Sequence, residues 1–337
     1  MIKEVIRLVR PGLFLPFFVV ESEPNDKILI RPRYLSICAA DQRYFQGNRP
    51  PEVLAKKLPL ALFHEAVGEV LHDPAGKLKT GTFCILLPGG IDSLKEDSNY
   101  KTGSFFRSSN SDGFCQELLY MDERELIPIQ SETIWPYVFT ELMSVCCQAL
   151  RKLETIKTLS PDMNIGIWGD GSMAYMMALT LHTLKPECQL SIFGKHDEKL
   201  LNFSFCSKRI NINDRSDSTQ IDIAFDCVGG NGSQPAIAHA IQKIRPTGVI
   251  VLMGVSEIPP MIFTRMILEK GLTLIGSSRS VYKDFLLAKK IIDDSTVKNS
   301  LLKIVSSQCS FSSASELTDI FNNDKNVPYK TILYKSF

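Results

Sequence analysis

The stretch Trp168-Gly169-Asp170-Gly171-Ser172-Met173-Ala174 follows a predicted strand, 164–168, and precedes an apolar helical segment, 173–184. It has the pattern G-x-G-x-x-A. In this setting the first glycine makes a tight turn, the second lets the backbone approach a pyrophosphate, and the small alanine lets helix and strand pack closely. The helix N-terminus offers N–H groups to the phosphates. We therefore expect a dinucleotide here, with a plain packing turn as the alternative, and the expected contacts are Gly169, Gly171, Ser172 and Ala174.

Further apolar runs that are typical of strands follow this turn, with helical segments between them: 189–193, 222–228, 248–254 and 272–276. Strands that alternate with helices predict a parallel, doubly wound sheet, so the fold class is α/β. We place this nucleotide-binding domain at 141–285. Gly229, Gly254 and Val255 stand at strand ends, where the nicotinamide half of the cofactor is expected, although glycines are also common there for structural reasons.

The end of the second strand indicates which dinucleotide binds. Enzymes that use NAD keep an acidic residue there for the ribose hydroxyls, whereas this chain has Gly194-Lys195-His196. Without a carboxylate a 2′-phosphate is not repelled, and Lys195 can pair with it. We therefore expect NADPH rather than NADH, with an ordinary solvated helix start as the alternative.

The residues before about 140 have a different sequence pattern from those that follow. Short β runs broken by Pro, Gly and Asp predict a compact antiparallel or barrel-like domain at 1–140, joined by the C-terminal segment 286–337. The polar stretch 89–112 is expected to be a long surface loop. The N-terminal run is interpreted as a first strand and turn rather than a secretion signal, because Pro16 interrupts it and acidic residues follow it.

Composition excludes several classes of protein. The chain of 337 residues is long enough for two domains, and its 38 Lys and Arg residues nearly balance 37 Asp and Glu residues, for a net charge of +1. That balance argues against binding to nucleic acid or to an anionic membrane. No apolar run approaches the roughly 18 residues of a membrane span. Nine cysteines without a C-x-x-C motif predict reduced thiols, and hence a cytoplasmic location.

Three segments of the first domain carry residues that bind metals: Ile37-Cys38-Ala39-Ala40-Asp41, Phe63-His64-Glu65-Ala66-Val67-Gly68 and Thr140-Glu141-Leu142. Each segment alone is unremarkable, since a lone Cys or His is more often part of the core. Together with the nucleotide-binding domain they resemble the zinc-dependent medium-chain dehydrogenase/reductase superfamily, over the whole chain. The resemblance implies a β-rich, GroES-like catalytic domain followed by a Rossmann domain.

Within that superfamily the sequence is most similar to the ribitol-5-phosphate dehydrogenases, or ribulose-5-phosphate reductases, of teichoic acid and capsule synthesis. Four strings carry this similarity: Ser36-Ile37-Cys38-Ala39-Ala40-Asp41-Gln42-Arg43-Tyr44, Gly166-Ile167-Trp168-Gly169-Asp170-Gly171, Cys227-Val228-Gly229-Gly230-Asn231-Gly232-Ser233 and Glu269-Lys270-Gly271-Leu272-Thr273-Leu274-Ile275-Gly276-Ser277-Ser278-Arg279-Ser280.

The resemblance implies one catalytic zinc site. Cys38 and His64 are its expected ligands, Glu65 is a ligand or an exchanging neighbour, and Glu141 takes the fourth position. A thiolate and an imidazole hold Zn²⁺ firmly, and a mobile carboxylate leaves a position open for water or substrate. Asp41 is expected to accept the free ring N–H of His64, with capping of a turn as the alternative.

Two departures from the family pattern matter. Many relatives have Ser or Thr two residues after the ligand Cys to relay a proton, whereas this chain has Ala40. The proton route then passes through bound water, Glu65 or a substrate hydroxyl. Relatives with a second, structural zinc have four closely spaced cysteines, whereas only Cys84 and Cys115 occur in the corresponding region, so we expect a single zinc.

A sugar phosphate requires cations near the metal, because a phosphate dianion is best held by forked or clustered donors. The candidates are Arg43, Arg107 and Arg279, and the resemblance to polyol dehydrogenases makes Arg279 the first choice. Each of them is also readily explained as a surface arginine. Tyr44 is expected to wall the substrate pocket.

The resemblance thus implies zinc-dependent reduction of D-ribulose 5-phosphate to D-ribitol 5-phosphate with hydride from NADPH, which feeds CDP-ribitol for teichoic acid or capsule. One alternative is an NAD-dependent polyol dehydrogenase of the sorbitol type. Another is a non-catalytic NADPH-binding partner subunit. The family also implies a homodimer or tetramer, and a complex with a cytidylyltransferase is a further expectation.

Overall fold

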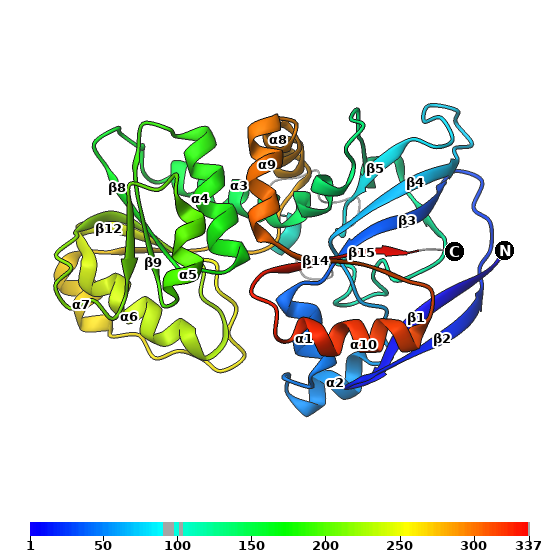
Figure 1. The fold of residues 1–337 in the computed structure, drawn as a ribbon, viewed down its shortest axis with the longest axis horizontal. Helices are drawn as coiled ribbons and strands as arrows, with labels where there is room; N and C mark the ends of the chain where they lie inside the picture. Colours follow the sequence, from blue (N-terminus) through cyan, green and yellow to red (C-terminus); the bar gives the residue numbers. More distant parts are fainter. Residues whose placement is uncertain (90–97, 101–103, 336–337) are drawn as a thin grey trace. The chain divides into compact units, whose positions relative to one another are not determined.

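The computed structural model describes residues 1–89, 98–100 and 104–335, and Figure 1 labels their helices and strands. The chain divides into two compact units. The first comprises Met1–Glu141 and Ser280–Phe337, and the second comprises Leu142–Arg279. Within the described part of the chain, no helix combines the length and the apolar character needed to cross a membrane.

The second unit is built on a sheet of parallel strands in the order β10-β9-β8-β11-β12-β13. These are β8 (Asn164–Trp168), β9 (Gln189–Gly194), β10 (Lys208–Asn211), β11 (Ile221–Asp226), β12 (Ile244–Leu252) and β13 (Thr273–Gly276). The helices of this unit are α4 (Ser172–Leu184), α5 (Asp197–Leu200), α6 (Ser233–Lys243) and α7 (Thr264–Lys270), and α3 (Thr140–Glu154) leads into it. The predicted α/β class is confirmed.

The order of the strands places a crevice at the end of β8. The next two long strands, β9 and β11, lie on opposite sides of β8, so the chain reverses direction across the sheet at this point. Ligands of open α/β sheets bind at such a switch point, beyond the carboxyl ends of the strands. The sequence prediction lacks strand β10, because its exposed Lys208 and Arg209 leave no apolar run to indicate it.

The first unit contains a sheet in the order β14-β15-β3-β4-β5-β7, with β6 on β3. Its strands are β3 (Ile28–Ser36), β4 (Ala66–His72), β5 (Phe83–Leu86), β6 (Leu119–Met121), β7 (Leu126–Pro128), β14 (Val305–Phe311) and β15 (Lys330–Lys335). All pairs are antiparallel except β14 with β15. The C-terminal segment belongs to this unit because β15 pairs with β3.

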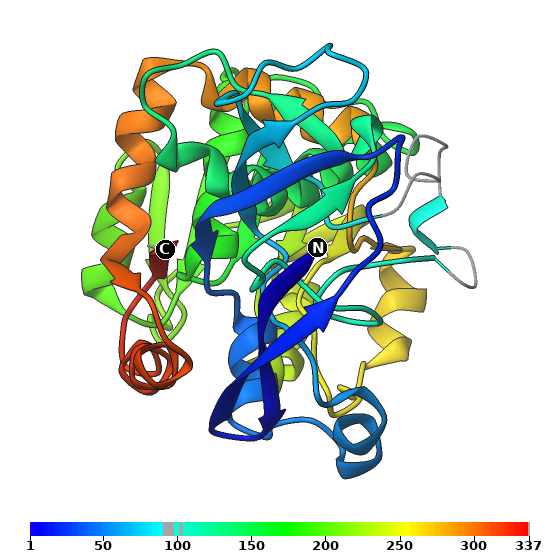
Figure 2. The same ribbon diagram turned by 90° about the vertical axis from the view of Figure 1, so that its right-hand side faces the viewer.

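A separate antiparallel hairpin precedes that sheet. It consists of β1 (Ile2–Arg10) and β2 (Leu13–Val20), the predicted first strand and turn, and is drawn in dark blue in Figure 2. The helices of the unit are α1 (Ala39–Phe45), α2 (Pro51–Lys57), α8 (Tyr282–Ile292), α9 (Ser295–Leu301) and α10 (Ala314–Asp324). Part of the predicted loop 89–112 lies outside the described residues; the rest includes a short 3-10 turn, Ser98–Tyr100.

Aromatic packing fixes the interior of the first unit. The ring of Phe321, from α10, lies 5.0 Å from the rings of both Phe14 and Phe45 and 5.7 Å from that of Phe63. Ring pairs at such distances add to the stabilisation that burial of apolar area provides. The C-terminal helix is thereby held against α1 and against the residue that precedes His64.

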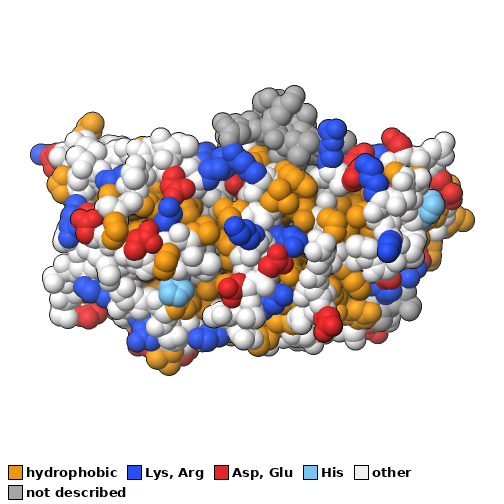
Figure 3. Space-filling view, turned by 90° about the horizontal axis from the view of Figure 1, so that it is seen from above, with side chains coloured by type: hydrophobic (Ala, Val, Ile, Leu, Met, Phe, Trp, Pro, Cys, Tyr) orange, Lys and Arg blue, Asp and Glu red, His pale blue; other side chains and the backbone are white. Residues whose placement is uncertain are grey.

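Lys, Arg, Asp and Glu side chains intermingle over the described residues of the face drawn in Figure 3, as the balanced composition predicts. A surface that binds a polyanion needs a face dominated by cations. Over the described residues of the face in Figure 3, neither sign of charge dominates.

The buried carboxyl group of Asp226, at the end of β11, makes the stability of the second unit depend on pH. Burial raises the pKa of Asp226 to about 6, against the pull of a hydrogen bond from the Val228 N–H to Oδ1. Because the folded-state pKa exceeds the unfolded value, this group makes the free energy of unfolding decrease as pH rises from about 4 to about 6.

We expect Asp226→Asn, which keeps the Oδ1 acceptor and removes the charge, to stabilise the unit at pH 7.5 by up to about 3 kcal/mol. It should also flatten the dependence of Tm on pH between about 4 and 6. Scanning calorimetry at several pH values measures both effects, and Glu198→Gln, which alters an exposed carboxylate of the same unit, is the control. A pH dependence that is unchanged in Asp226→Asn contradicts the assignment.

Candidate functional site

The pairing of β3 with β4 assembles a cluster of metal-binding side chains. Leu35 of β3 pairs with Ala66 of β4, so the chain that leaves β3 lies beside the chain that enters β4. Cys38, the N-cap of α1, therefore meets His64 and Glu65. One ligand atom from each of these three residues lies within 4.8 Å of the others.

The backbone that precedes His64 adopts an uncommon conformation. Phe63 has a φ of 73°, in the left-handed region that residues other than glycine rarely adopt. Its N–H donates to Asp41 Oδ1 at 3.1 Å, and its ring is held by Phe321. Such strain persists only where the surrounding contacts fix it, and it is common at functional sites.

Asp41 holds this region together, but not in the way we predicted. Its Oδ1 lies 3.9 Å from His64 Nδ1, which is too far for a hydrogen bond. Instead Asp41 accepts hydrogen bonds from the N–H of Cys38, the N–H of Phe63 and the hydroxyl of Ser108. The expected direct bond to the His64 ring is therefore wrong for this structure. The alternative, a carboxylate that caps the turn, describes the geometry.

The electrostatic environment of the cluster suits a cation. Burial by itself lowers the pKa of His64, but the neighbouring Cys38 and Asp41 raise it well above its ordinary value. Burial and the nearby Glu65 raise the pKa of Glu141 to about 7, against the opposing effect of His64. Both shifts favour a proton on these groups, because negative charge gathers in a buried place, and a bound metal cation would take the place of those protons.

Glu141 lies close to this cluster but outside its tight core. It is buried at the start of α3, and His64, Glu65, Lys330 and Asp41 all affect its pKa. Among the described residues, the set whose ligand atoms lie within 4.8 Å of one another does not include it. Its role as the fourth ligand stays a prediction.

Sequence reasoning missed Lys330, the first residue of β15. Its Nζ lies 2.7 Å from Glu65 Oε1, and both side chains are buried. Burial lowers the pKa of Lys330, but Glu65 and Cys38 raise it above its ordinary value. The other oxygen, Glu65 Oε2, is buried without a hydrogen-bond partner. The only signal in the sequence is a charged residue that opens the apolar strand Lys330-Thr331-Ile332-Leu333.

The donor set passes a test of fit for zinc. A thiolate, an imidazole and a carboxylate are the ligands that Zn²⁺ takes in catalytic sites, where a fourth position stays open. The unpartnered Glu65 Oε2 is an acceptor that nothing else in the described structure satisfies. Buried polar atoms normally have partners, so an ion is a natural one here.

The predicted substrate residues are placed less clearly. Tyr44 is buried in the core, with the guanidinium of Arg49 lying 4.0 Å from its ring centroid. Arg43 lies in α1 and is half-buried. The Arg107 guanidinium lies over the rings of Phe105 and Phe114 and faces a separate cavity. Arg279 ends the second unit, with a φ of 59°.

The second unit contains a cavity of about 280 Å³ at the predicted dinucleotide turn. The structure brings together five of the predicted cofactor residues in its lining: Gly169, Gly171, Gly194, Lys195 and Gly229. Ser172 and Ala174 open α4 next to this turn. Gly254 and Val255 are not part of that lining, but the backbone of Val255 approaches Gly229 so closely that a side chain there would collide with it.

The prediction of NADPH assumed that no carboxylate lies at the end of the second predicted strand, which is β9. Asp170, the residue between the two glycines, corrects that assumption. Its Oδ2 accepts hydrogen bonds from the N–H groups of Lys195 and His196, at 2.7 and 3.0 Å, and lies 2.9 Å from His196 Nδ1. Burial raises the pKa of Asp170, but these bonds outweigh that effect and lower it. A carboxylate therefore does reach the end of β9, supplied by the turn, and its charge is engaged by these donors.

Aromatic side chains that sequence reasoning did not assign to the site wall the same cavity. The rings of Trp168 and Phe193 are stacked with centroids 4.3 Å apart, and Trp168 Nε1 donates to His239 Nδ1 at 3.1 Å. Burial lowers the pKa of His239. The His239 ring is almost perpendicular to those of Trp168 and Phe193, at 78° and 84°, so the three rings form an aromatic corner against which a base can pack. In the sequence, Trp168 and Phe193 stand at the ends of two predicted strands, and that position could have indicated that they line the site.

Comparison with known proteins identifies relatives over the whole chain. Residues 24–131 match the family described as the alcohol dehydrogenase GroES-like domain, as expected. Ribulose-5-phosphate reductase 1 of Staphylococcus aureus is 40% identical, covering 99% of each chain. The ribulose-5-phosphate reductase of Streptococcus pneumoniae is 35% identical, covering 98% of this chain and 97% of its own. The crystal structure of S. aureus TarJ in complex with NADPH has a TM-score of 0.89 at 37% identity, covering 100% of both chains.

We expect Lys195→Ala to weaken binding of NADPH roughly tenfold and to leave NADH nearly unaffected, because only NADPH carries the 2′-phosphate. A tenfold change corresponds to about 1.4 kcal/mol, a reasonable value for one exposed charge-assisted contact. Fluorescence titration with both nucleotides measures this, with Lys208→Ala on β10 as the control. An equal loss for both nucleotides contradicts the role of Lys195.

Proposed function

Since the chain belongs to the ribulose-5-phosphate reductase family of the medium-chain dehydrogenase/reductases, we propose that it reduces D-ribulose 5-phosphate to D-ribitol 5-phosphate with hydride from NADPH. The observation that carries the proposal is the cluster of Cys38, His64 and Glu65, present in a chain whose second unit forms a nucleotide cavity at G-x-G-x-x-A. The relative solved with NADPH supports the choice of cofactor.

We propose that Cys38, His64 and Glu65 hold one zinc ion, with Glu141 in the fourth position. When bound, the zinc ion would act as a Lewis acid on the ketone oxygen, and NADPH would supply the hydride. Glu65 can offer Oε2 to a metal while its Oε1 stays bound to Lys330. Lys330 thus positions the carboxylate and offsets part of the negative charge that the cluster gathers.

The surrounding residues prepare this site before any ligand arrives. Asp41 accepts hydrogen bonds from the backbone N–H groups of Cys38 and of Phe63, the residue before His64. One carboxylate therefore fixes both chain segments that carry the cluster. Ser108 fixes that carboxylate in turn. Ala40 offers no hydroxyl, so Glu65 or a hydroxyl of the substrate is our proposed route for the alcohol proton.

For the phosphate of the substrate we propose Arg279 as the main contact, with Arg43 of α1 as a second one. Tyr44 of the same helix is buried, so its ring would back the pocket rather than contact the phosphate. The support is chemical, because a planar guanidinium binds a phosphate through two parallel hydrogen bonds. The left-handed backbone of Arg279 is also typical of a position that its surroundings fix.

We expect Arg279→Ala to raise KM for ribulose 5-phosphate at least tenfold, with a smaller effect on an unphosphorylated ketose. Steady-state assays with both substrates measure the difference, and Arg245→Ala, an exposed arginine paired with Asp222, is the control. A uniform effect on both substrates overturns the phosphate role.

We propose that the second unit forms the interface of a homodimer. Strand β13 is an edge of its sheet, and a group of large apolar side chains is exposed before and within α7: Val255, Ile258, Met261, Phe263 and Leu268. Edge strands and apolar patches that are left open favour association. Light scattering should give the dimer mass, or the tetramer mass if dimers pair, and Phe263→Glu should give the monomer. A monomeric wild-type chain contradicts this.

The similarity to reductases of teichoic acid and capsule synthesis supports a further proposal, that the product feeds CDP-ribitol through a cytidylyltransferase. This would take place in the cytoplasm, where such thiols stay reduced. Co-purification of the two enzymes from cells tests the complex, and separate elution of both partners at micromolar concentration contradicts it.

The proposed activity is tested by NADPH oxidation with a panel of ketose phosphates, with and without a zinc chelator. Ribulose 5-phosphate should be the preferred substrate, and the chelator should abolish its turnover. Higher activity with sorbitol or ribitol and NAD favours the polyol dehydrogenase. Binding of NADPH by a zinc-free protein without any turnover favours the non-catalytic subunit.

We expect Cys38→Ser to lower kcat by at least a thousandfold and to leave the affinity for NADPH unchanged, because Cys38 belongs to the metal cluster and the nucleotide cavity lies in the other unit. Zinc content by mass spectrometry should fall in parallel. Cys309→Ser, a half-buried thiol of the same unit, should retain both zinc and activity. Full zinc content in Cys38→Ser contradicts its role as a ligand.

A further inference from the structure

The first unit contains a second cavity, of about 540 Å³, which the proposed reaction does not use. It lies between the β1–β2 hairpin and the residues around 105–120. None of the candidate metal ligands, nor Asp41 or Lys330, belongs to its lining.

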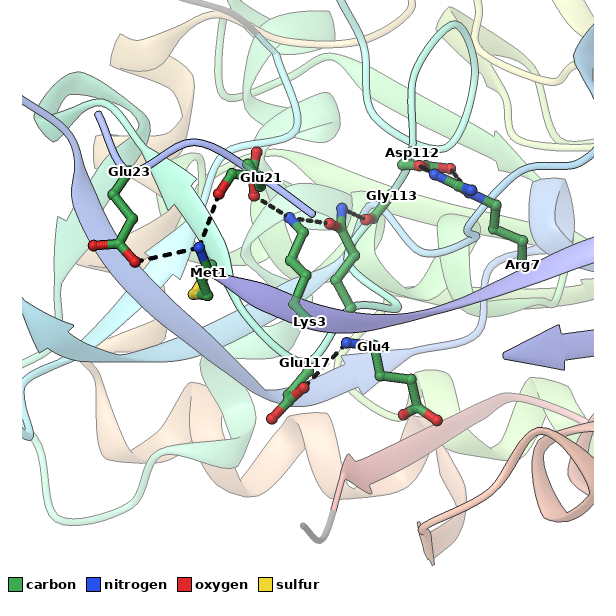
Figure 4. A network of polar contacts seen from close by, with 10 residues as sticks. Met1, Lys3, Glu4, Arg7, Glu21, Glu23, Asp112, Gly113 and Glu117 are labelled. Atoms are coloured by element: carbon green, nitrogen blue, oxygen red, sulfur yellow. Dashed lines mark hydrogen bonds and ion pairs between the residues drawn. The ribbon is translucent and has the colours of Figure 1, made fainter. Parts of the chain in front are cut away.

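Cations outnumber anions around this cavity. Lys3, Arg7, Lys27 and Arg107 line it, against the carboxylates of Glu21 and Asp112 alone. Figure 4 shows Lys3 and Arg7 projecting from β1, with Lys3 directed to Glu21 and Arg7 forming a fork with Asp112. Both carboxylates of the lining are therefore already paired.

Among the described residues Arg107 differs from the other three cations, because no carboxylate forms an ion pair with it. The buried Glu125 is the carboxylate whose charge acts on it most strongly, against the burial that lowers the pKa of Arg107. Its guanidinium lies 5.1 Å and 5.5 Å from the ring centroids of Phe105 and Phe114, and its Nε is buried without a hydrogen-bond partner. Ser111, whose backbone bridges to that of Arg107, also has a buried hydroxyl without a partner. Buried donors normally have acceptors, so two such donors in one cavity indicate a missing acceptor.

The neighbours of Arg107 show that this cavity is separate from the metal cluster. Phe106 contacts the His64 ring, with centroids 5.6 Å apart, and Ser108 donates to Asp41. The two residues that flank Arg107 thus face the metal cluster, and the Arg107 side chain lines the other cavity. This placement gives Arg107 a role other than contact with a substrate at the metal.

We propose that this cavity is a second anion site, which binds the dianionic phosphate group of a small molecule through Arg107. A guanidinium presents parallel N–H donors that match two phosphate oxygens, and the Ser111 hydroxyl can donate to a third. Lys27, whose side chain is 40% exposed, adds a mobile positive charge at the rim. The weak pairing of Lys27 with Asp122, at 3.6 Å, leaves that charge available to a ligand.

The remainder of the lining indicates a phosphate ester rather than free phosphate. Val5, Val19 and Leu119 give the cavity apolar walls, and Phe105 and Tyr120 add aromatic ones. A site for inorganic phosphate alone needs no such surface, whereas the organic part of a monoester gains from burial against it.

Calorimetric titration tests the proposal on the full-length enzyme saturated with NADPH. The Arg279→Ala enzyme is the reference, and the further variants are made in it, so that the proposed substrate contact does not add a second phosphate site. The probes are inorganic phosphate, glycerol 3-phosphate and phenyl phosphate at constant ionic strength. We expect one site per chain, at least tenfold weaker binding in Arg107→Gln, a two- to fivefold loss in Lys27→Gln, and unchanged binding in Arg10→Gln, an exposed arginine at the end of β1. Phenyl phosphate should bind more tightly than inorganic phosphate.

Absence of binding to the NADPH-saturated reference enzyme, or reference affinity in both Arg107→Gln and Lys27→Gln, overturns the proposal. Lys27→Gln serves as the test if Arg107→Gln does not fold, because Lys27 lies at the surface. Inorganic phosphate that binds as tightly as the esters overturns the assignment to an ester. Because no ribulose 5-phosphate is present, the test is independent of the proposed reaction, whose failure would appear only as missing turnover of that substrate.

Discussion

Strand β3 pairs with β4 on one side and with β15 on the other, and the metal cluster depends on both pairings. The first pairing brings Cys38 beside His64 and Glu65. The second places Lys330 next to Glu65, although the two residues are 265 positions apart in the sequence. A buried carboxylate and a buried ammonium are both costly to desolvate, and each makes the other tolerable only while the sheet keeps them 2.7 Å apart. Sheet register therefore sets the chemistry of the site.

In each unit, one aspartate fixes a turn by accepting hydrogen bonds from backbone N–H groups. Asp41 binds backbone N–H groups on both arms of the metal cluster, and Asp170 binds two successive N–H groups at the end of β9. In each case one carboxylate stabilises a turn that carries functional residues. Carboxylates that accept charge-assisted hydrogen bonds fix local geometry more firmly than neutral acceptors do. Both sites are thus prepared by the fold before a ligand binds.

The segment around residues 105–108 connects the metal cluster with the second cavity. Successive side chains face opposite sides: Phe106 contacts His64, a candidate metal ligand, Ser108 bonds to Asp41, and Arg107 lines the cationic cavity. Ser108 also has a positive φ of 60°, which marks a strained turn. A segment of this kind can position catalytic neighbours and bind an anion with the same few residues.

The sequence by itself determined the α/β class, because strands that alternate with helices form a parallel sheet. It also indicated the dinucleotide turn, which is a local string with a fixed spacing. The candidate ligands Cys38, His64 and Glu65 were indicated by the resemblance to a known family, since no single segment points to them. Only the tertiary structure decided what depends on contacts between distant segments. It showed that Lys330 pairs with Glu65 and that Asp170 lies at the end of β9. It also showed that Asp41 accepts hydrogen bonds from three other donors and not from the His64 ring. A side chain's partner is set by strand register and by the course of loops, and a linear pattern does not encode either of these locally.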